Sequence, residues 1–380
     1  MIDATWLESS SNPEEAADLT AQLVALKSYP GEEGEVQRAV ADWLSAHDLL
    51  PELQQTEGDR PNVIARVENG DGPTLLLNGH VDTVLAVEGW SSDPWWCKRD
   101  GDKLYGLGAC DMKAGVAAAM MATRALAQRR DLWSGTLIFS SVVDEEAYSI
   151  GARALISSGI QADACIVTES SWLQPALGSV GKTLVMTDVT GKAAHATWPA
   201  DGINAAVEAS RFVALLGDME LGRHPRLASS QCVLSFLSGS AQYVITVPEK
   251  ARVLINRHIV PGETGETVLE QMRTLATSLA SQATFDFNIQ PPYYPPWEID
   301  LAHPFAQIFD SAYRTETGLP PNYSYRGFGD ANLFSSELGV PTIQFGPHGA
   351  NYHQANEWVD VPSVGGTVRV LLRVALAMLG

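Results

Sequence analysis

Short apolar runs alternate with longer segments of helical spacing over the first 170 residues or so of the chain. Near-continuous apolar runs are typical of strands that are buried on both faces of a sheet. The intervening segments repeat apolar residues every three or four positions, as in helices that pack on such a sheet. The expected strands are 62–67, 74–78, 136–143 and 164–168, and the expected helices are 13–28, 35–47, 112–129 and 150–158. The pattern predicts an α/β domain with a mostly parallel sheet and helices on both faces.

The order of elements changes near residue 180. The expected elements are then strand 182–189, helix 203–216, strands 231–237 and 251–257, helix 266–279 and strand 284–289. This β-α-β-β-α-β order is typical of a ferredoxin-like α+β unit. A cluster of four prolines between 291 and 296 indicates a boundary, after which helix 304–316, strand 341–345 and helix 362–379 resume the first pattern. We therefore expect the smaller domain, 180–291, to be inserted between two parts of a larger one, 1–179 and 292–380.

Charge and composition exclude some partners. The chain has 380 residues, with 25 Lys and Arg against 45 Asp and Glu, and a formal charge of −20. This balance argues against nucleic acid or an anionic membrane as a partner. We expect no apolar run to approach the roughly 20 residues of a membrane span, and the first residues have no signal-peptide pattern. The four cysteines lack CxxC spacing, which is typical of reduced thiols, so we expect a cytoplasmic protein.

Potential metal ligands follow the expected strands. His80 and Asp82 come directly after strand 74–78, and an imidazole can bind a metal while a nearby carboxylate selects the ring nitrogen that does so. Glu145, Glu146 and Glu169 follow the next two expected strands of this domain. Sites in parallel sheets form at the carboxyl ends of the strands. We therefore expect these side chains at one edge of the sheet.

Each candidate also has a plainer interpretation. Asp111 precedes a helix, so it can be a helix N-cap or a carboxylate that bridges two metal ions, and the two roles do not exclude each other. Glu145 and Glu146 form either a solvated acidic turn or a pair in which one carboxylate binds metal and its neighbour activates a water as general base.

The histidines near residue 350 follow another apolar strand. His348 or His353 is either a metal ligand or a loop residue, and the spacing alone indicates that His195 is a surface residue. A mixture of imidazoles and carboxylates suits a two-metal hydrolytic site for zinc, cobalt or manganese. The chain has no P-loop, no GxGxxG after a strand and no GxSxG elbow as a rival site.

Six short motifs follow one another at fitting intervals. They are Gly79–Val84, Tyr105–Lys113, Asp144–Glu146, Thr168–Glu169, Gly191–His195 and His353–Glu357. In these motifs, over nearly its whole length, the chain resembles the dinuclear zinc amidohydrolases and peptidases that include acetylornithine deacetylase, succinyl-diaminopimelate desuccinylase, aminoacylase and glutamate carboxypeptidase. The inserted unit is similar to the lid of that family, which implies a homodimer formed through the lid.

The resemblance implies a ligand set for two divalent metal ions, zinc or alternatively cobalt or manganese. His80 and Glu169 would hold one ion, Glu146 and His353 the other, and Asp111 would bridge them.

It also implies roles around the metal ions. Asp82 would orient His80. Glu145 would take a proton from the attacking water and pass it to the leaving amine. His195, on the lid of the partner subunit, would hydrogen-bond the developing oxyanion.

The chain departs from this family at substrate-binding positions. Leu107 stands where the family usually has Arg, Ile245–Pro248 replaces the common Asn-x-Ile-Pro, and 256–258 reads Asn-Arg-His where the family has D-x-R. The family's Arg commonly binds the substrate carboxylate. Neighbouring strand residues face opposite sides, so Arg257 cannot take its place. The candidate substrate contacts are therefore His258, Arg326 and Gly329.

The expected activity is hydrolysis of the amide bond of an N-acyl amino acid or a similar small peptide-like substrate. The alternatives are a di- or tripeptidase, or carboxypeptidase, with the same site and a catalytically silent metal-binding protein. The retained Glu145 beside a full ligand set argues against the silent protein.

Overall fold

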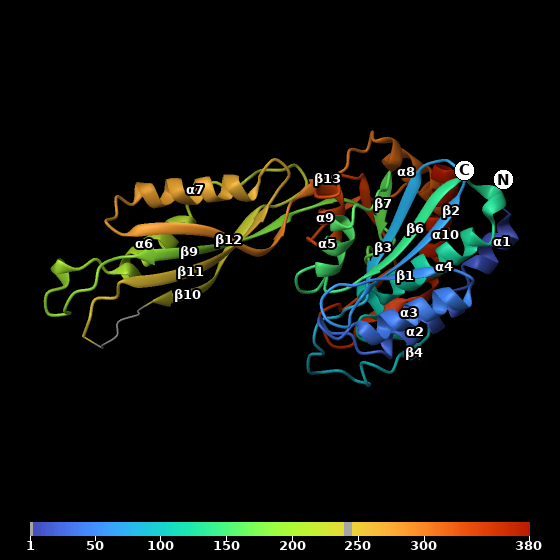
Figure 1. Ribbon diagram of the computed structural model, residues 1–380, viewed down its shortest axis with the longest axis horizontal. Helices are drawn as coiled ribbons and strands as arrows, with labels where there is room; N and C mark the ends of the chain where they lie inside the picture. The colour runs from blue at the N-terminus through green and yellow to red at the C-terminus, as the bar shows by residue number, and fades with distance from the viewer. Residues whose placement is uncertain (1–2, 239–244) are drawn as a thin grey trace. The chain divides into compact units, whose positions relative to one another are not determined.

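The computed structural model describes residues 3–238 and 245–380 and divides into two compact units (Figure 1). The first unit consists of Met1–Gly178, Glu298–Tyr325 and Gly329–Gly380, and the second of Ser179–Trp297 and Arg326–Phe328. The smaller unit therefore lies within the sequence of the larger one.

A nine-stranded sheet forms the centre of the first unit. Its strand order is β1 (Pro51–Gln54), β2 (Asn62–Asn69), β6 (Gly135–Val142), β3 (Thr74–His80), β7 (Ala164–Val167), β15 (Thr342–Gln344), β8 (Ala176–Ser179) and β13 (Trp297–Glu298), and β14 (Ser324–Arg326) pairs with β8. β6, β3, β7 and β15 pair in parallel, whereas β1 and β2 are antiparallel to their neighbours. The parallel strands thus present their carboxyl ends at one edge.

Helices cover both faces of this sheet, as Figure 1 shows. α4 (Ala114–Ala127) and α10 (Val361–Leu379) pack on β3 and β6, with α2 (Pro13–Val24) and α8 (Pro304–Thr317) against α10. α5 (Ile150–Ser157) and α9 (Asp330–Ser336) lie on the other side, and α3 (Gly34–Ala46) packs on β1 and β2. The predicted α/β fold class is confirmed. The chain begins with α1 (Ala4–Ser10), which the pattern did not indicate.

Small residues bring α4 close to the sheet. A Cβ at Gly115 would lie 1.8 Å from the carbonyl oxygen of Thr168, so only glycine allows this approach. Thr168 directly precedes Glu169, and Asp111 lies just before α4. The contact therefore brings two of the candidate site segments together.

The last helix corrects our expectation about membrane-length segments. Among the described residues, α10 alone is long and apolar enough to cross a membrane by length and composition. Much of it is buried, because it packs against α2, α4 and α8 and against β3 and β6. Its apolar length is that of a helix in the middle of the core.

The segment 90–108, for which the sequence pattern indicated no strand or helix, contains two short strands. β4 (Lys98–Asp100) and β5 (Lys103–Tyr105) join β16 (Gly349–Ala350) and β17 (Trp358–Asp360) in a small antiparallel sheet. In its register Tyr105 lies opposite Trp358 and Leu104 opposite Val359. The sheet thereby places the segment before Asp111 beside the segment after His353.

The second unit has the element order that the sequence predicted. It consists of β9 (Gly181–Thr190), α6 (Ala205–Leu216), β10 (Ser230–Ser238), β11 (Lys250–Ile259), α7 (Gly265–Ser278) and β12 (Thr284–Tyr294), in the antiparallel order β10-β11-β9-β12. Alternate residues of β9 are buried, and Val185 and Val189 join Phe212 of α6 and Met272 of α7 in one core. The ferredoxin-like α+β arrangement follows from this alternation.

This unit extends past residue 291, where we expected it to end. β12 continues through Pro291 and Pro292 to Tyr294, with an irregularity in its pairing between Gln290 and Tyr294. β12 is an edge strand, where proline is tolerated because one row of backbone groups needs no partner. The prolines therefore lie within the strand, and the unit runs to Trp297.

Candidate active site

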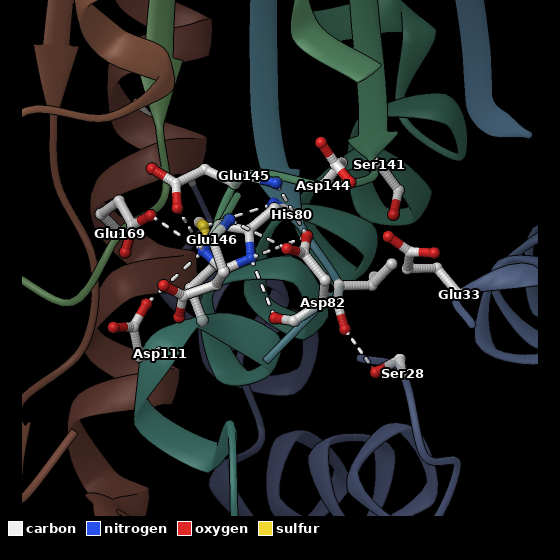
Figure 2. A network of polar contacts seen from close by, with 12 residues as sticks. Ser28, Glu33, His80, Asp82, Asp111, Ser141, Asp144, Glu145, Glu146 and Glu169 are labelled. Carbon is white, nitrogen blue, oxygen red and sulfur yellow. Dashed lines mark hydrogen bonds and ion pairs between the residues drawn. The ribbon is translucent and has the colours of Figure 1, made fainter. Parts of the chain in front are cut away.

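His80 is the last residue of β3, and its ring is buried (Figure 2). Its Nδ1 lies 3.1 Å from the backbone carbonyl oxygen of Asp82. A carbonyl oxygen can only accept, so Nδ1 donates to it, and Nε2 is the ring nitrogen that faces the cluster. Nε2 is buried without a hydrogen bond, although carboxylate oxygens of Glu169 and Asp111 lie 3.1 Å and 3.5 Å away.

Asp111 presents its two oxygens to two different histidines. Oδ1 lies 3.5 Å from Nε2 of His80, and Oδ2 lies 3.4 Å from Nε2 of His353. The N-cap interpretation is wrong, because the N-cap position of α4 is Lys113 and Asp111 sits in an irregular turn with non-helical φ and ψ. The side chain is therefore available to interact with both histidines at once.

Glu145 and Glu146 follow β6 and turn toward His80, as Figure 2 shows. Oε1 of Glu146 lies 3.1 Å from Nε2 of His353, and Oε2 of Glu145 lies 3.9 Å from Nε2 of His80. The side chain of Glu146 is only 8% exposed and that of Glu145 only 13%. The solvated acidic turn is therefore excluded.

Asp82 holds this turn in place. Its carboxylate accepts the backbone N–H of Glu145 at 3.1 Å and of Glu146 at 2.9 Å, and Nδ1 of His80 lies 3.4 Å from Oδ1. The predicted carboxylate beside His80 is thus present. Its strongest contacts, however, go to the main chain of the two glutamates, which the sequence did not indicate.

A buried ion pair between Arg60 and Asp144 holds the same turn from outside the cluster. Nη1 of Arg60 lies 2.6 Å from Oδ1 of Asp144 and 3.2 Å from Oε1 of Glu33. Asp144 directly precedes Glu145 and has a positive φ of 70°. Sequence reasoning gave no role to Arg60 or Glu33.

His353 lies in a turn with several left-handed residues. Asn351, His353 and Asn356 have φ of 64°, 61° and 59°, and Nδ2 of Asn351 donates to the carbonyl oxygen of Asn356 at 3.1 Å. His348 lies apart from the cluster, with its ring against Trp358 at 5.5 Å. Of the two histidines, His353 is the one that the structure places beside Asp111.

The electrostatics of the cluster reflect uncompensated carboxylates. Burial raises the pKa of Glu145 well above its usual value, and burial with the nearby Asp111 raises the pKa of Glu169 to about 7. Asp111 and Glu146 raise the pKa of His353 to about 10. Burial would lower the pKa of His80, but Glu169 and Asp111 outweigh it and raise that pKa. Each raised pKa favours the protonated form, which makes the histidines positive, the glutamates neutral and the cluster less negative.

This donor set fits divalent cations. Ligand atoms of His80, Asp111 and Glu146 lie within 4.8 Å of one another, as do those of His80, Glu145 and Glu169. Imidazole nitrogen with carboxylate oxygen suits zinc, cobalt or manganese. A cation on the lone pair of His80 would also satisfy the buried Nε2 atom that has no hydrogen bond.

Gly329 lies against Glu145. A Cβ at Gly329 would lie 2.6 Å from Oε1 of Glu145, so the missing side chain leaves room for that carboxylate. Its predicted role in substrate binding stays a prediction. The side chain of Arg326, another predicted contact, lies outside the described residues.

His195 and His258 belong to the second unit. His195 is exposed in the segment after β9, and its Nδ1 accepts the N–H of Thr197 at 3.2 Å. Nδ1 of His258 lies 3.1 Å from Oγ of Ser230, and Nε2 lies 3.4 Å from Nδ2 of Asn256. The roles assigned to both stay predictions.

Residues 76–377 match the model of a known family, described as Peptidase family M20/M25/M40. The chain belongs to this family. Among curated M20 relatives, the succinyl-diaminopimelate desuccinylase of Paracoccus denitrificans (strain Pd 1222) is 28% identical over 94% of this chain and 97% of its own. The acetylornithine deacetylase of Aliivibrio fischeri (strain MJ11) is 34% identical over 50% of this chain and 52% of its own.

Solved M20-like structures share the fold over nearly the whole chain. Aminopeptidase PepT from Bacillus cereus ATCC 10987 has a TM-score of 0.80 at 21% identity, covering 97% of this chain and 99% of its own. A Bacillus subtilis protein described as a dinuclear metal-binding peptidase of the M20 family has a TM-score of 0.75 at 18% identity, covering 99% of each chain. The predicted resemblance is confirmed, and the chain is an M20 hydrolase of amide or peptide bonds.

Proposed function

We propose that this protein is a two-cation amidohydrolase that removes the acyl group from an N-acyl amino acid or a similar small substrate. One observation carries the proposal: Asp111 faces two histidines with separate oxygens, and each histidine has its own glutamate 3.1 Å away. Two equivalent ligand pairs on either side of one carboxylate support a dinuclear site.

The ligands are those implied by the motifs. His80 and Glu169 would hold one cation, Glu146 and His353 the other, and Asp111 would bind both. Bound there, two divalent cations would polarise the substrate carbonyl and lower the pKa of a water. The metal is zinc, cobalt or manganese, because this set lacks thiolate and is rich in oxygen.

Glu145 acts as the general base. Its carboxylate is buried beside the ligands, and burial raises its pKa, which favours accepting a proton. It would take the proton from the attacking water and pass it to the leaving amine. Asp82 holds the main chain of Glu145 and Glu146, and Gly329 leaves space for the base.

The sequence relatives support a deacylase, since they are named as a desuccinylase and a deacetylase. The structural neighbour named as an aminopeptidase keeps exopeptidase activity as the second candidate. Hydrolysis of N-acetyl, N-succinyl and N-formyl amino acids alongside di- and tripeptides separates them. Turnover of acyl amino acids in preference to peptides supports the deacylase. The reverse preference supports the peptidase. If no member of the panel is hydrolysed in a cation-dependent way, the proposal is contradicted.

The second unit supports a homodimer. β10 is an edge strand of its sheet, and Leu234 and Leu237 on it are 53% and 65% exposed. Unpaired strand edges with apolar side chains are surfaces for association. Sedimentation velocity tests the dimer. If His195 acts on the partner subunit's site, mixed dimers of His195→Ala and Glu145→Gln chains regain activity that neither variant has alone.

Cation binding is expected to release protons and to tighten as the pH rises. His353, with a pKa of about 10, and Glu169, with a pKa of about 7, must both lose a proton before they bind a cation. At a pH below these pKa values, the affinity for the cation rises about tenfold per pH unit for each proton that binding displaces. Calorimetric titration with zinc between about pH 6 and pH 8, in buffers of different ionisation enthalpy, counts the protons. An affinity independent of pH would contradict this ligand set.

A further inference from the structure

Glu357 is a buried carboxylate that lies behind the cluster and accepts three main-chain N–H groups. Oε2 accepts the N–H of Gly108 at 2.8 Å, and Oε1 accepts those of Cys110 at 2.8 Å and Asp111 at 2.9 Å. Its side chain is almost fully buried. All three donors belong to the turn that carries Asp111.

The turn needs such an acceptor because its backbone is irregular. Gly108 has a φ of 75°, and Asp111 lacks helical φ and ψ. Lys113 still donates to the carbonyl oxygen of Gly108 at 2.9 Å, but the N–H groups of Gly108, Cys110 and Asp111 donate to Glu357 instead. Buried N–H groups without partners are costly. One carboxylate thus takes the place of the hydrogen bonds that a regular element would supply.

Glu357 also belongs to the segment that carries His353. It lies four residues after His353, directly after Asn356, whose carbonyl oxygen accepts from Asn351. Its own carbonyl oxygen accepts the N–H of Gly106 at 3.0 Å, next to the β5–β17 pairing. The residue therefore joins the two segments whose side chains meet between Asp111 Oδ2 and His353 Nε2.

We propose that Glu357 is a positioning residue that fixes Asp111 relative to His353 and so sets the affinity for the bridged cation pair. This inference rests on the proposed two-cation site. His353 is half exposed and sits on a turn, so its position depends on the contacts of that segment. A shift of the Asp111 main chain would move both of its oxygens and change the geometry for both cations. Partners behind the ligands typically contribute about 10- to 100-fold to metal affinity.

Glu357→Gln is the sharpest variant, because it keeps shape and removes one acceptor. The amide oxygen can accept from Cys110 and Asp111, while the amide NH₂ then faces the N–H of Gly108. We expect zinc affinity, measured by competition with a chelator, to weaken about 10- to 100-fold. At saturating zinc we expect kcat to fall with little change in KM, since no substrate contact is removed.

The matched control is Glu316→Gln. Glu316 is also largely buried and accepts from Arg369 and from Arg373, at 2.5 Å and 2.7 Å, on the helical side of the same unit. A purely structural loss lowers Tm without changing zinc affinity, which is what we expect of this control. Should the Gln variant at 357 fail to fold, Glu357→Asp keeps the charge but shortens the side chain, and the same loss of affinity is expected.

The outcomes separate this inference from the proposed function. If wild-type protein binds two zinc ions and Glu357→Gln binds both with unchanged affinity, Glu357 only stabilises the fold and the inference is overturned. If wild-type protein binds no zinc, the two-cation site itself is wrong, and the inference fails with it. Weakened affinity in the Gln variant but not in the control supports the positioning role.

Discussion

Replacing Glu145 by glutamine is expected to lower kcat by about 10²- to 10⁴-fold, the usual contribution of a general base. The amide cannot accept the proton from water, yet it keeps the size of the carboxylate. Glu145 Oε2 lies 3.9 Å from His80 Nε2, farther than Glu169 Oε1 at 3.1 Å, so we expect the ligand set to survive. Initial rates on the best substrate of the panel measure the loss, and metal analysis of the purified variant measures cation content.

Gly329→Ala provides a companion test of the same base. The added methyl would lie 2.6 Å from Glu145 Oε1, and because φ at Gly329 is 175°, the backbone accepts alanine without strain. The carboxylate must move away instead. We expect a smaller fall in kcat than in Glu145→Gln, with both cations retained. Full activity in Glu145→Gln would exclude this residue as the base, and full activity in Gly329→Ala alone would show that the carboxylate reacts from another position.

His80, Glu145 and Glu169 were predictable as site residues because they lie at or just after the ends of parallel strands. Three apolar runs end just before or at His80, Glu145 and Glu169, and parallel strands bring such ends to one edge. The motifs selected His353 over His348, and the structure brings His353 to Asp111. The fold class followed from the same alternation of strands and helices.

The contacts that hold the site residues in place, such as those of Glu357 and Arg60, were not predictable, because no hydrophobic periodicity indicates them. β5 and β17 have three residues each, too few to show an alternating pattern, yet their pairing sets Glu357 beside the Asp111 turn. The hydrogen bonds of Glu357 join residues almost 250 positions apart. The Arg60–Asp144 ion pair likewise joins two distant segments. Only the folded chain shows which carboxylates face the cations and which face main-chain N–H groups.

Removing divalent cations is expected to abolish turnover and to lower the thermal stability of the protein. Without cations, the carboxylates of Asp111, Glu145, Glu146 and Glu169 lie close together with only two imidazoles among them. Burial, with the neighbouring carboxylates as a further cause, raises the pKa values of Glu145, Glu146 and Glu169, so the folded state is penalised for keeping these three groups charged. A cation that binds only the folded state, at about a thousandfold above its Kd, stabilises by about 4 kcal/mol. We therefore expect Tm to rise as zinc or manganese is returned to chelated protein, together with activity.

Two histidines on one segment provide the matched pair for this experiment. His353→Ala removes a ligand of one cation, so we expect loss of activity and a smaller rise in Tm on adding zinc. His348→Ala removes a ring that packs on Trp358, outside the cluster, so we expect the wild-type response to zinc. An equal response of both variants would remove His353 from the ligand set. If the protein keeps both its Tm and its turnover after chelation removes the divalent cations, the activity does not depend on cations bound by these carboxylates. The two-cation mechanism would then be wrong.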